Sequence, residues 1–249
     1  MKKLLWILSI ILVASCNSED APGCFKKAGE IMQDEVAVDP FNEIIVYERV
    51  KLYIQQGPVQ KVVIETGKNL RQDVSVEVID NRLSIRNENS CNLVREYELT
   101  KVYVTIPDLT WLQNSSGSSI ESIGTLKLNA LHLLSVNQEN DLSIHTDGDF
   151  ILDLDVENLK ITNDNVSNYF LTGKAENFNV FFAAGDGRLD APGLIVKNYQ
   201  IFHRGTNKMI VFPVESIKGE LRSSGNVIAK NKPAVVNVEA YYTGRLIFE

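Results

Sequence analysis

Glycine recurs at a fixed interval in the second half of the chain, and this interval restricts the folds that the chain can form. Gly185, Gly205 and Gly225 are evenly spaced, and Gly244 follows one residue short of the same interval. Glycine adopts positive φ without steric cost, so each of these residues can form a sharp corner. Repeats of roughly 20 residues are typical of chains that coil and stack, because one repeat cannot bury its apolar side chains alone.

The start of the same half carries a weaker form of the repeat. Gly117 and Asn137 are separated by the same interval as Gly185 and Gly205, and asparagine is the usual substitute for glycine at positive φ. Beyond Asn137 the spacing slips. We expect Asn163 or Asp164 to occupy the intermediate corner, with several inserted residues near 145–155.

Short apolar runs lie between these corners. Apolar and polar residues alternate in several of them, which is the pattern of half-buried strands, and no segment after the N-terminal signal has a sustained helical period. We predict an all-β chain and, for residues 109–249, a right-handed parallel β-solenoid. The alternative is an antiparallel barrel or sandwich, in which turns also recur at short intervals. The runs are residues 126–128, 131–133, 159–161, 178–181, 194–196, 217–221 and 235–238.

An earlier set of predicted strands precedes the repeats. Residues 43–47, 50–54 and 61–65 combine alternation with β-branched and aromatic side chains. We predict an N-terminal β-strand region over residues 36–108 that runs directly into the solenoid, so that 36–249 is one continuous domain.

Residues 1–15 have the three parts of a secretory signal. Two lysines are followed by an apolar run over residues 4–13 and then by two small residues. The apolar run is shorter than the roughly 20 residues that a transmembrane helix needs. Residues 13–16 (VASC) resemble the bacterial lipobox, in which the cysteine is acylated and becomes the new N-terminus. We therefore predict a signal peptide and a lipid anchor at Cys16, with a secreted protein and an incidental Cys16 as the alternative.

The segment after the cysteine is polar. We expect residues 16–35 to form a lipidated, flexible tether. Residues 17–20 (NSED) resemble the acidic signal that sends Bacteroidetes lipoproteins to the outer face of the outer membrane, although a plain solvated tether fits as well. The predicted location is the outer membrane, exposed at the cell surface in one version and periplasmic in the other.

The two remaining cysteines, Cys24 and Cys91, suggest a disulfide. An exported chain enters an oxidising compartment, where such bonds form and persist. A Cys24–Cys91 bond would attach the tether to the first folded region. The alternative is two free thiols.

The charge of the chain excludes one class of partner. Its formal net charge is −7, and loss of Lys2 and Lys3 with the signal takes it to −9. An acidic chain repels nucleic acid and anionic lipid, so we expect no nucleic-acid partner and contact with the membrane through the lipid anchor.

No catalytic or metal motif is recognisable. The three histidines, His132, His145 and His203, are not at metal-ligand spacing, and no Cys/His cluster exists. We expect no cofactor and no metal, and place His132 on the surface of a sheet. The chain also lacks a P-loop, a dinucleotide fingerprint and a nucleophile elbow.

Acidic residues cluster in the repeats and leave one catalytic alternative open. Paired carboxylates suit glycoside hydrolysis, and β-helices that cleave acidic polysaccharides hold stacked carboxylates on one face. A glycan-active enzyme is therefore the alternative to a non-catalytic protein, whereas solvated turn acids are the simpler explanation. The acids are Asp141, Asp147, Asp149, Asp153, Asp155, Asp164, Asp186 and Asp190.

Aromatic residues recur at similar intervals. Outward-facing rings would suit the docking of a glycan or a protein, while inward-facing rings would fill the interior of the coils. The rings are Tyr169, Phe170, Phe181, Phe182, Tyr199, Phe202, Phe212, Tyr241 and Tyr242.

An ordered set of short motifs resembles one known family. The motifs lie at residues 39–46, 50–57, 81–85, 104–109, 115–118, 223–227, 232–233 and 242–244. Together they are similar to the putative auto-transporter adhesin head GIN domain, a domain of unknown function found mainly in Bacteroidetes lipoproteins. The resemblance covers about residues 36–249. The middle repeats lack the family's Ser-Gly pair at 136–138 and 162–164, which leaves the number of coils there open.

The resemblance implies a β-helix-like fold and a role at the cell surface, without a known ligand or catalytic set. We therefore predict an envelope-anchored lipoprotein that acts as an adhesin-like binding module or as a structural module. The final strand, over residues 246–248, would need to be paired or covered, which suggests a homodimer.

Overall fold

The computed structural model describes residues 26–89, 98–137 and 141–249. The predicted signal peptide, Cys16, Cys24 and Cys91 all lie outside these ranges. Within them, no helix has the length and apolar character needed to cross a membrane.

The prediction of an all-β chain is confirmed. In the described residues, sixteen strands form one large, open and mostly parallel sheet, and the one helical element is the 3-10 helix η2. The strands of the first half are β1 (Ile31–Val36), β2 (Glu43–Tyr47), β3 (Lys51–Gln56), β4 (Lys61–Gly67), β5 (Val74–Ile79), β6 (Arg82–Asn87), β7 (Lys101–Ile106) and β8 (Trp111–Ser115), with η2 at Lys68–Asp73. Those of the second half are β9 (Ile120–Ser135), β10 (Phe150–Asn163), β11 (Asn168–Phe182), β12 (Arg188–His203), β13 (Met209–Leu221), β14 (Val227–Ala229), β15 (Val235–Ala240) and β16 (Leu246–Phe248).

The long strands β9 to β13 pair in parallel with their sequence neighbours. One inward row shows the register: Leu159 pairs with Phe178, Phe178 with Tyr199, and Tyr199 with Ile217. Every pairing among β9 to β16 is parallel. These registers exclude the antiparallel barrel or sandwich for this half.

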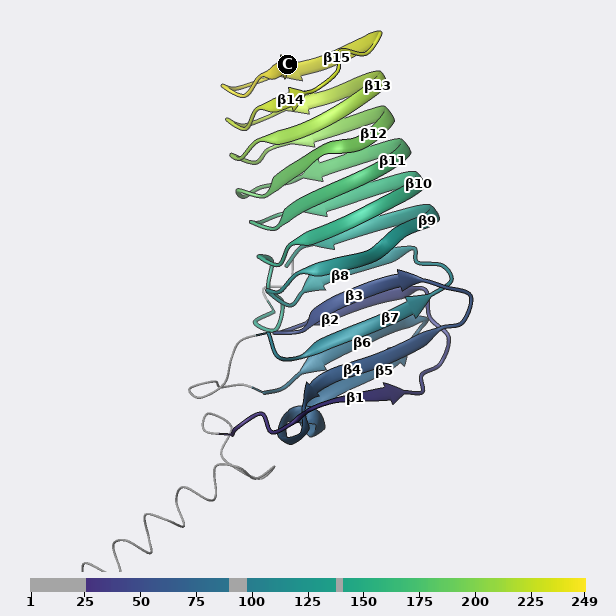
Figure 1. Cartoon of the computed structure of the whole chain (residues 1–249). Helices are drawn as coiled ribbons and strands as arrows, with labels where there is room; N and C mark the ends of the chain where they lie inside the picture. Colours follow the sequence, from purple (N-terminus) through teal and green to yellow (C-terminus); the bar gives the residue numbers. More distant parts are fainter. Residues whose placement is uncertain (1–25, 90–97, 138–140) are drawn as a thin grey trace, which may run out of the picture.

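Each long strand bends near its middle, so that its two halves lie in two layers (Figure 1). The alternation of burial changes phase at the bend. In β10, Glu157 and Asn158 are consecutive and both exposed, whereas Leu154 before them and Leu159 after them are buried. The phase change keeps apolar side chains inside both layers. The runs predicted separately at 126–128 and 131–133 are accordingly two parts of β9.

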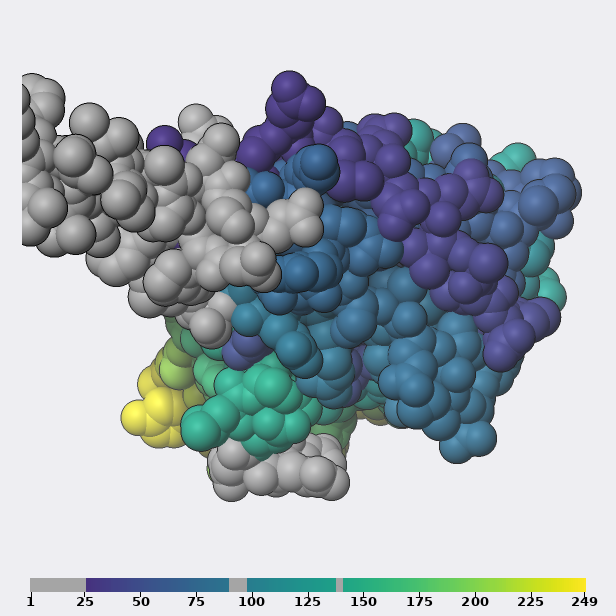
Figure 2. Space-filling model, turned by 90° about the horizontal axis from the view of Figure 1, so that it is seen from below, coloured from purple at the N-terminus to yellow at the C-terminus, as the bar shows by residue number. Residues whose placement is uncertain are grey.

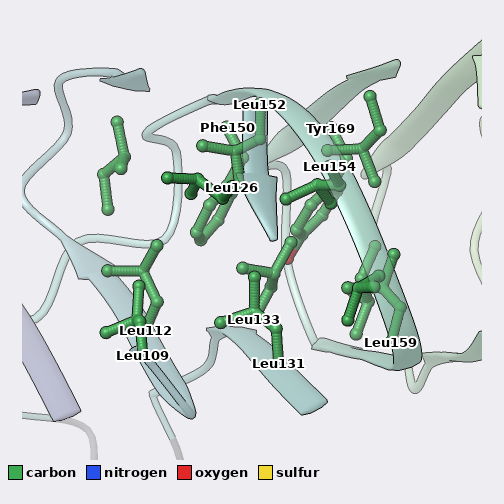
Figure 3. Close-up of a cluster of buried hydrophobic side chains, with 14 of the residues drawn as sticks. Leu109, Leu112, Leu126, Leu131, Leu133, Phe150, Leu152, Leu154, Leu159 and Tyr169 are labelled. Carbon is green, nitrogen blue, oxygen red and sulfur yellow. The ribbon is translucent and has the colours of Figure 1, made fainter. Parts of the chain in front are cut away.

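The buried side chains form one continuous core between the layers. Figure 3 shows part of it, where Leu112 of β8 lies beside Leu133, its partner in β9. Aromatic rings stack along the core, and the Phe150 and Tyr169 rings are 4.8 Å apart and nearly parallel. Residues of the N-terminal strands and of the repeats therefore share one interior.

The first strands continue both layers toward the N-terminus. In one layer β3 pairs in parallel with β7 and β9, and in the other β2 pairs in parallel with β6 and β8. Beyond these, the direction alternates, because β4 is antiparallel to both β1 and β7, and β5 is antiparallel to β6. The helix η2 connects β4 in one layer to β5 in the other and buries Leu70. Figure 2 views this end, which the early residues cover.

The expected role of the recurring glycines is right at two corners and wrong at three. Gly117 and Gly185 have positive φ, 72° and 84°, whereas Gly205, Gly225 and Gly244 do not. At Gly225 a Cβ atom would lie 2.2 Å from the His203 ring, and at Gly244 it would lie 2.4 Å from the Gly225 carbonyl oxygen. Gly225 and Gly244 are required because successive repeats approach too closely there for a side chain.

The expected position of the insertion, near 145–155, is right only for residues before Phe150. Residues 150–163 are the continuous strand β10, and the additional residues lie between Ser135 and Phe150. Asn137 does not have positive φ. Its side chain instead bridges this loop: the amide NH₂ donates to the carbonyl oxygens of Asp141 and Ile144, and the amide oxygen accepts the Asp141 N–H.

Candidate functional site

The second halves of β10 to β13 present a flat outward surface with an ordered set of polar and aromatic side chains. We call it the asparagine face. Parallel pairing in register places equivalent residues of successive strands in rows across this surface. The three rows are Asn158, Asn177, Asn198 and Ser216; Lys160, Asn179, Gln200 and Lys218; and Thr162, Phe181, Phe202 and Glu220.

The first row is a ladder of hydrogen-bonded side chains. The Asn177 amide donates to the Asn158 amide oxygen at 3.1 Å, and the Asn198 amide donates to the Asn177 oxygen at 3.4 Å. The Ser216 hydroxyl donates to Asn198 at 2.8 Å and ends the ladder. Each amide carries a second N–H, which forms no hydrogen bond with any described residue. The ladder therefore fixes the amides and leaves donors directed at solvent.

A shallow groove of about 340 Å³ follows the first two rows. Asn179, Gln200 and Lys218 contribute to its lining together with the ladder, and no acidic side chain of the described chain does. Neither Lys160 nor Lys218 forms an ion pair with a described residue. The groove thus combines amide donors and acceptors with the ammonium group of Lys218, and Lys160 lies outside its lining at the end of the same row.

Two stacked rings flank the groove. The Phe181 and Phe202 rings are 4.8 Å apart and 18° from parallel, and the exposed fraction of Phe181 is 39%. Because their faces contact one another, the rings present their edges to solvent. Stacking of this kind contributes about 0.5–1.5 kcal/mol beyond the buried area and holds the third row rigid.

Some of the predicted aromatic rings face outward and others face inward; the sequence had left both orientations open. Phe170, Phe181, Tyr241 and Tyr242 are exposed, and Phe202 and Phe212 are half-buried. The other predicted rings, Tyr169, Phe182 and Tyr199, fill the interior.

His132 adjoins the asparagine face, as a residue of β9 that pairs with Lys160. Burial, with a smaller contribution from the Lys160 charge, lowers the pKa of His132 to about 4. Its Nε2 atom is 2.9 Å from the Thr162 hydroxyl. The prediction of a sheet position holds, but the ring is half-buried and neutral near pH 7.

His203 has a structural role at a corner of the stack. It is fully buried, and burial lowers its pKa. The Gly205 N–H lies 3.4 Å from Nδ1, and Nε2 lies 2.9 Å from the Asn207 carbonyl oxygen. The neutral form with its proton on Nε2 satisfies both contacts.

The acidic residues that raised the catalytic alternative do not converge. Asp153 accepts hydrogen bonds from the Thr125 and Thr172 hydroxyls, and Asp155 forms an ion pair with Lys174 at 3.2 Å. These residues lie in the other layer from the asparagine face. Lys160 belongs to the second half of β10, in the layer of the asparagine face.

The remaining acids serve turns and loops. Burial raises the pKa of Asp164, whose carboxylate accepts the Asn137 N–H. Asp149 binds the Asn168 side chain, and Asp186 accepts the Thr206 hydroxyl. Asp190 pairs with Arg188. In residues 26–89, 98–137 and 141–249, no three His, Cys, Asp or Glu side chains form a group that could hold a metal ion.

Sequence reasoning missed the amide ladder. Asn158, Asn177 and Asn198 are 19 and 21 residues apart, which is close to the spacing of the glycines. The same search for repeats, applied to asparagine, would have found it.

Comparisons with known proteins agree with this fold. A crystal structure of a putative adhesin from Bacteroides fragilis NCTC 9343 superimposes with a TM-score of 0.76 at 17% identity, covering 90% of this chain and 99% of that one. A putative adhesin from Parabacteroides merdae ATCC 43184 gives 0.57 at 18% identity, covering 89% and 97%. A putative lipid binding protein from Parabacteroides distasonis ATCC 8503 gives 0.60 at 16% identity, covering 88% and 97%. At these identities the likeness concerns the fold.

A search of curated proteins finds no match. The family described as "putative auto-transporter adhesin, head GIN domain" matches residues 40–233, in agreement with the resemblance of the short motifs. The chain belongs to this head GIN domain family.

Proposed function

We propose that this protein is a lipid-anchored, non-catalytic binding module of the cell surface and that its asparagine face binds glycans. The ordered amide ladder beside a groove is the observation that carries the proposal. Membership of a family described as adhesins and the adhesin names of similar structures support a binding role.

The scaffold of this module is, in our proposal, a right-handed parallel β-solenoid. The parallel registers of β9 to β13 and the bend in each strand support this arrangement. Crossovers between parallel strands of one sheet are right-handed in roughly 98% of cases, which supports the hand. A solenoid repeats one row of side chains at each coil, so it can present regularly spaced contacts to a polymer.

The chemistry of the groove suits a sugar chain with acidic groups. Amides donate and accept hydrogen bonds at once, as sugar hydroxyls do. Lys160 and Lys218 add positive charge in a chain whose net charge is −7. Because neither ammonium group is neutralised by a described residue, a carboxylated sugar would gain a charge-assisted hydrogen bond.

A glycan array tests this directly with the chain from residue 17 onward, which contains all described residues. We expect binding to glycans that carry uronic or sialic acids, and a loss of about tenfold or more for Lys218→Ala, which removes the ammonium group of the groove. Lys127→Ala is the control, because Lys127 is an exposed lysine of the opposite layer. Absence of binding, or an equal loss in both variants, would refute the assignment of the face.

The enzyme alternative would need two carboxylates facing one substrate site. No acidic side chain of the described residues lines the groove. The non-catalytic role is therefore the function we propose, and the array also tests it, because sugar release from a bound glycan would contradict it.

Anchoring is the second part of the proposal. Residues 13–16 support acylation of Cys16, and the acidic residues after it support export to the outer face of the outer membrane. Labelling of cells with a palmitate analogue should mark the wild type and not Cys16→Ser. Release by protease from intact cells would support surface exposure, and protection would indicate the periplasmic side.

The Cys24–Cys91 disulfide remains a proposal. Alkylation without reductant should leave the mass of the chain from residue 17 unchanged. Two added labels would show free thiols instead.

A further inference from the structure

The C-terminal end of the strand stack is open, and we propose that it pairs with the same end of a second copy of this chain. In this dimer, β15 of one copy lies antiparallel to β15 of the other. The proposal is independent of glycan binding and of the lipid anchor.

The first observation is that the core reaches solvent at this end. The inward row through Phe178, Tyr199 and Ile217 continues to Val236 in β15. Tyr199 and Ile217 are at most 2% exposed, whereas Val236 is 42% exposed. Phe248 of β16, in the other layer, is 37% exposed. Both layers thus end in partly exposed apolar side chains, with the Lys232 ammonium group 5.7 Å from the centre of the Phe248 ring.

The second observation is that both final strands have a free edge. β15 pairs with β13 and β16 with β14, and neither has a further neighbour among the described strands. β15 carries one charged residue, Glu239, in its sequence VVNVEA. In Figure 1, β15 is the outermost labelled strand at the C-terminal end of the stack. An edge this long and apolar is a template for another strand.

A partner that covers this end must offer one free strand edge to each layer and apolar side chains between the two edges. The C-terminal end of a second copy of this chain offers both. A two-fold axis that crosses both layers reverses the strand direction and keeps each layer opposite itself, so β15 meets β15 and β16 meets β16. Such an isologous contact is the commonest way in which identical chains associate.

Charge also favours this end over other surfaces. Residues 226–249 contain three basic side chains (Lys230, Lys232 and Arg245) and two acidic ones (Glu239 and Glu249), a net charge of +1, whereas the whole chain has −7. Two copies of an acidic protein repel one another least where the local charge is not acidic.

Side-chain direction restricts the register. Val236 and Val238 belong to inward rows, and Asn237 to an outward row. Directly opposite residues of antiparallel strands point to the same side, so inward residues must face inward residues. A register with Asn237 on the two-fold axis places Val236 opposite Val238 twice and keeps the two Glu239 side chains apart.

The mass of the chain from residue 17, measured by light scattering and sedimentation from 1 to about 100 μM, is the first test. We expect a dimer that dissociates on dilution. The dimer should also be elongated, because ten spacings of about 4.8 Å give each stack a length of roughly 48 Å and the pairing doubles it. A monomer throughout this range, or a compact dimer, would overturn the proposal.

Val236→Lys should raise the dissociation constant by at least about tenfold, because it places a charge in the apolar contact. Ile151→Lys is a matched control: Ile151 is 43% exposed and lies in β10, in the middle of the strand order. Dimerisation that resists Val236→Lys, or that is lost equally in Ile151→Lys, would place the contact elsewhere.

A cysteine at position 237 tests the register. In a chain with Cys24→Ser and Cys91→Ser, Asn237→Cys should form a disulfide-linked dimer under mild oxidation, because opposite Cβ atoms of antiparallel strands are about 4.5–5.5 Å apart. Asn179→Cys, an exposed position in the middle of the same layer, should stay monomeric on a non-reducing gel. Equal cross-linking of both variants would contradict the proposed axis.

Discussion

At its N-terminal end the stack finishes with antiparallel strands and a 3-10 helix, whereas at its C-terminal end it finishes with two strand edges that have no described neighbour. In the outermost N-terminal strand β1, the inward residues Met32, Asp34 and Val36 are half-buried, whereas Val236 of the outermost C-terminal strand β15 is 42% exposed. Both strands have one free edge among the described strands, so the two ends differ in how far their inward rows are covered.

The two outermost strands differ in charge as well. In β1, Asp34 forms an ion pair with Arg71 and Glu35 one with Lys61. Charged side chains on an edge strand discourage pairing with another chain. β15 has Glu239 alone. The comparison indicates that charged side chains on β1 oppose pairing with a further strand, whereas the edge of β15 can pair with one.

The largest change in the free energy of unfolding is expected near the C-terminal end, where successive repeats are in close contact. Gly225→Ala should lower the free energy of unfolding by about 3 kcal/mol, because the new Cβ would meet the His203 ring and the Asn207 carbonyl oxygen. Gly193→Ala, whose Cβ would make an ordinary contact of 3.4 Å with Thr172, should change it by less than about 0.5 kcal/mol. Urea unfolding measures both. Similar values would show that the coils are less tightly packed than described.

A smaller effect is expected for a valine pair that compares the ends directly. Val62→Ala should reduce the free energy of unfolding by about 2 kcal/mol, since it removes two buried methyl groups and leaves a cavity. Val236→Ala, measured at a concentration at which the chain is monomeric, should reduce it by less than about 0.5 kcal/mol. Equal losses would mean that the C-terminal end is as well covered as the N-terminal end.

The smallest expected effect is a difference in how groups near the two ends make the free energy of unfolding depend on pH. The pKa of His203 and that of His132 are lowered in the fold, so the unfolded chain binds protons more readily as the pH falls below about 6.5 and the free energy of unfolding decreases. At the N-terminal end, hydrogen bonds from Gln33 and Lys101 lower the pKa of Glu65, and its contribution is lost only below about pH 4.5.

Acidification from pH 7 to 5 should therefore weaken the C-terminal half first. Between pH 7 and 5, the free energy of unfolding should depend less steeply on pH in His132→Gln than in the wild type. Glu65→Gln should keep the pH dependence of the wild type. A pH dependence confined to the region below 4.5 would contradict the assignment to the histidines.

Much of the C-terminal half follows from local sequence. The even spacing of Gly185, Gly205 and Gly225 predicts parallel stacking at a constant interval, and the registers agree. The predicted reason for glycine is wrong at Gly225 and Gly244, because close approach between successive repeats arises only when the strands pack and cannot be predicted from the local sequence.

Two features could not be predicted from the local sequence. The segment around Asp153 and Asp155 resembles a polar turn, although Leu152 and Leu154 alternate with the two acids and supply the pattern of a strand. Pairing of the first strands depends on contacts between distant segments, so nothing local shows that β2 lies between β6 and β8. The amide ladder, in contrast, was readable from its spacing.

Hydrogen exchange on the monomeric Val236→Lys chain tests the central contrast most directly. Amides of β4, which lies between two strands, should be protected throughout, whereas peptides covering 235–240 should exchange about half of their amides at once, because one edge of β15 is free. Protection of 235–240 equal to that of 61–67 would show that the C-terminal end is already closed, and would contradict the account.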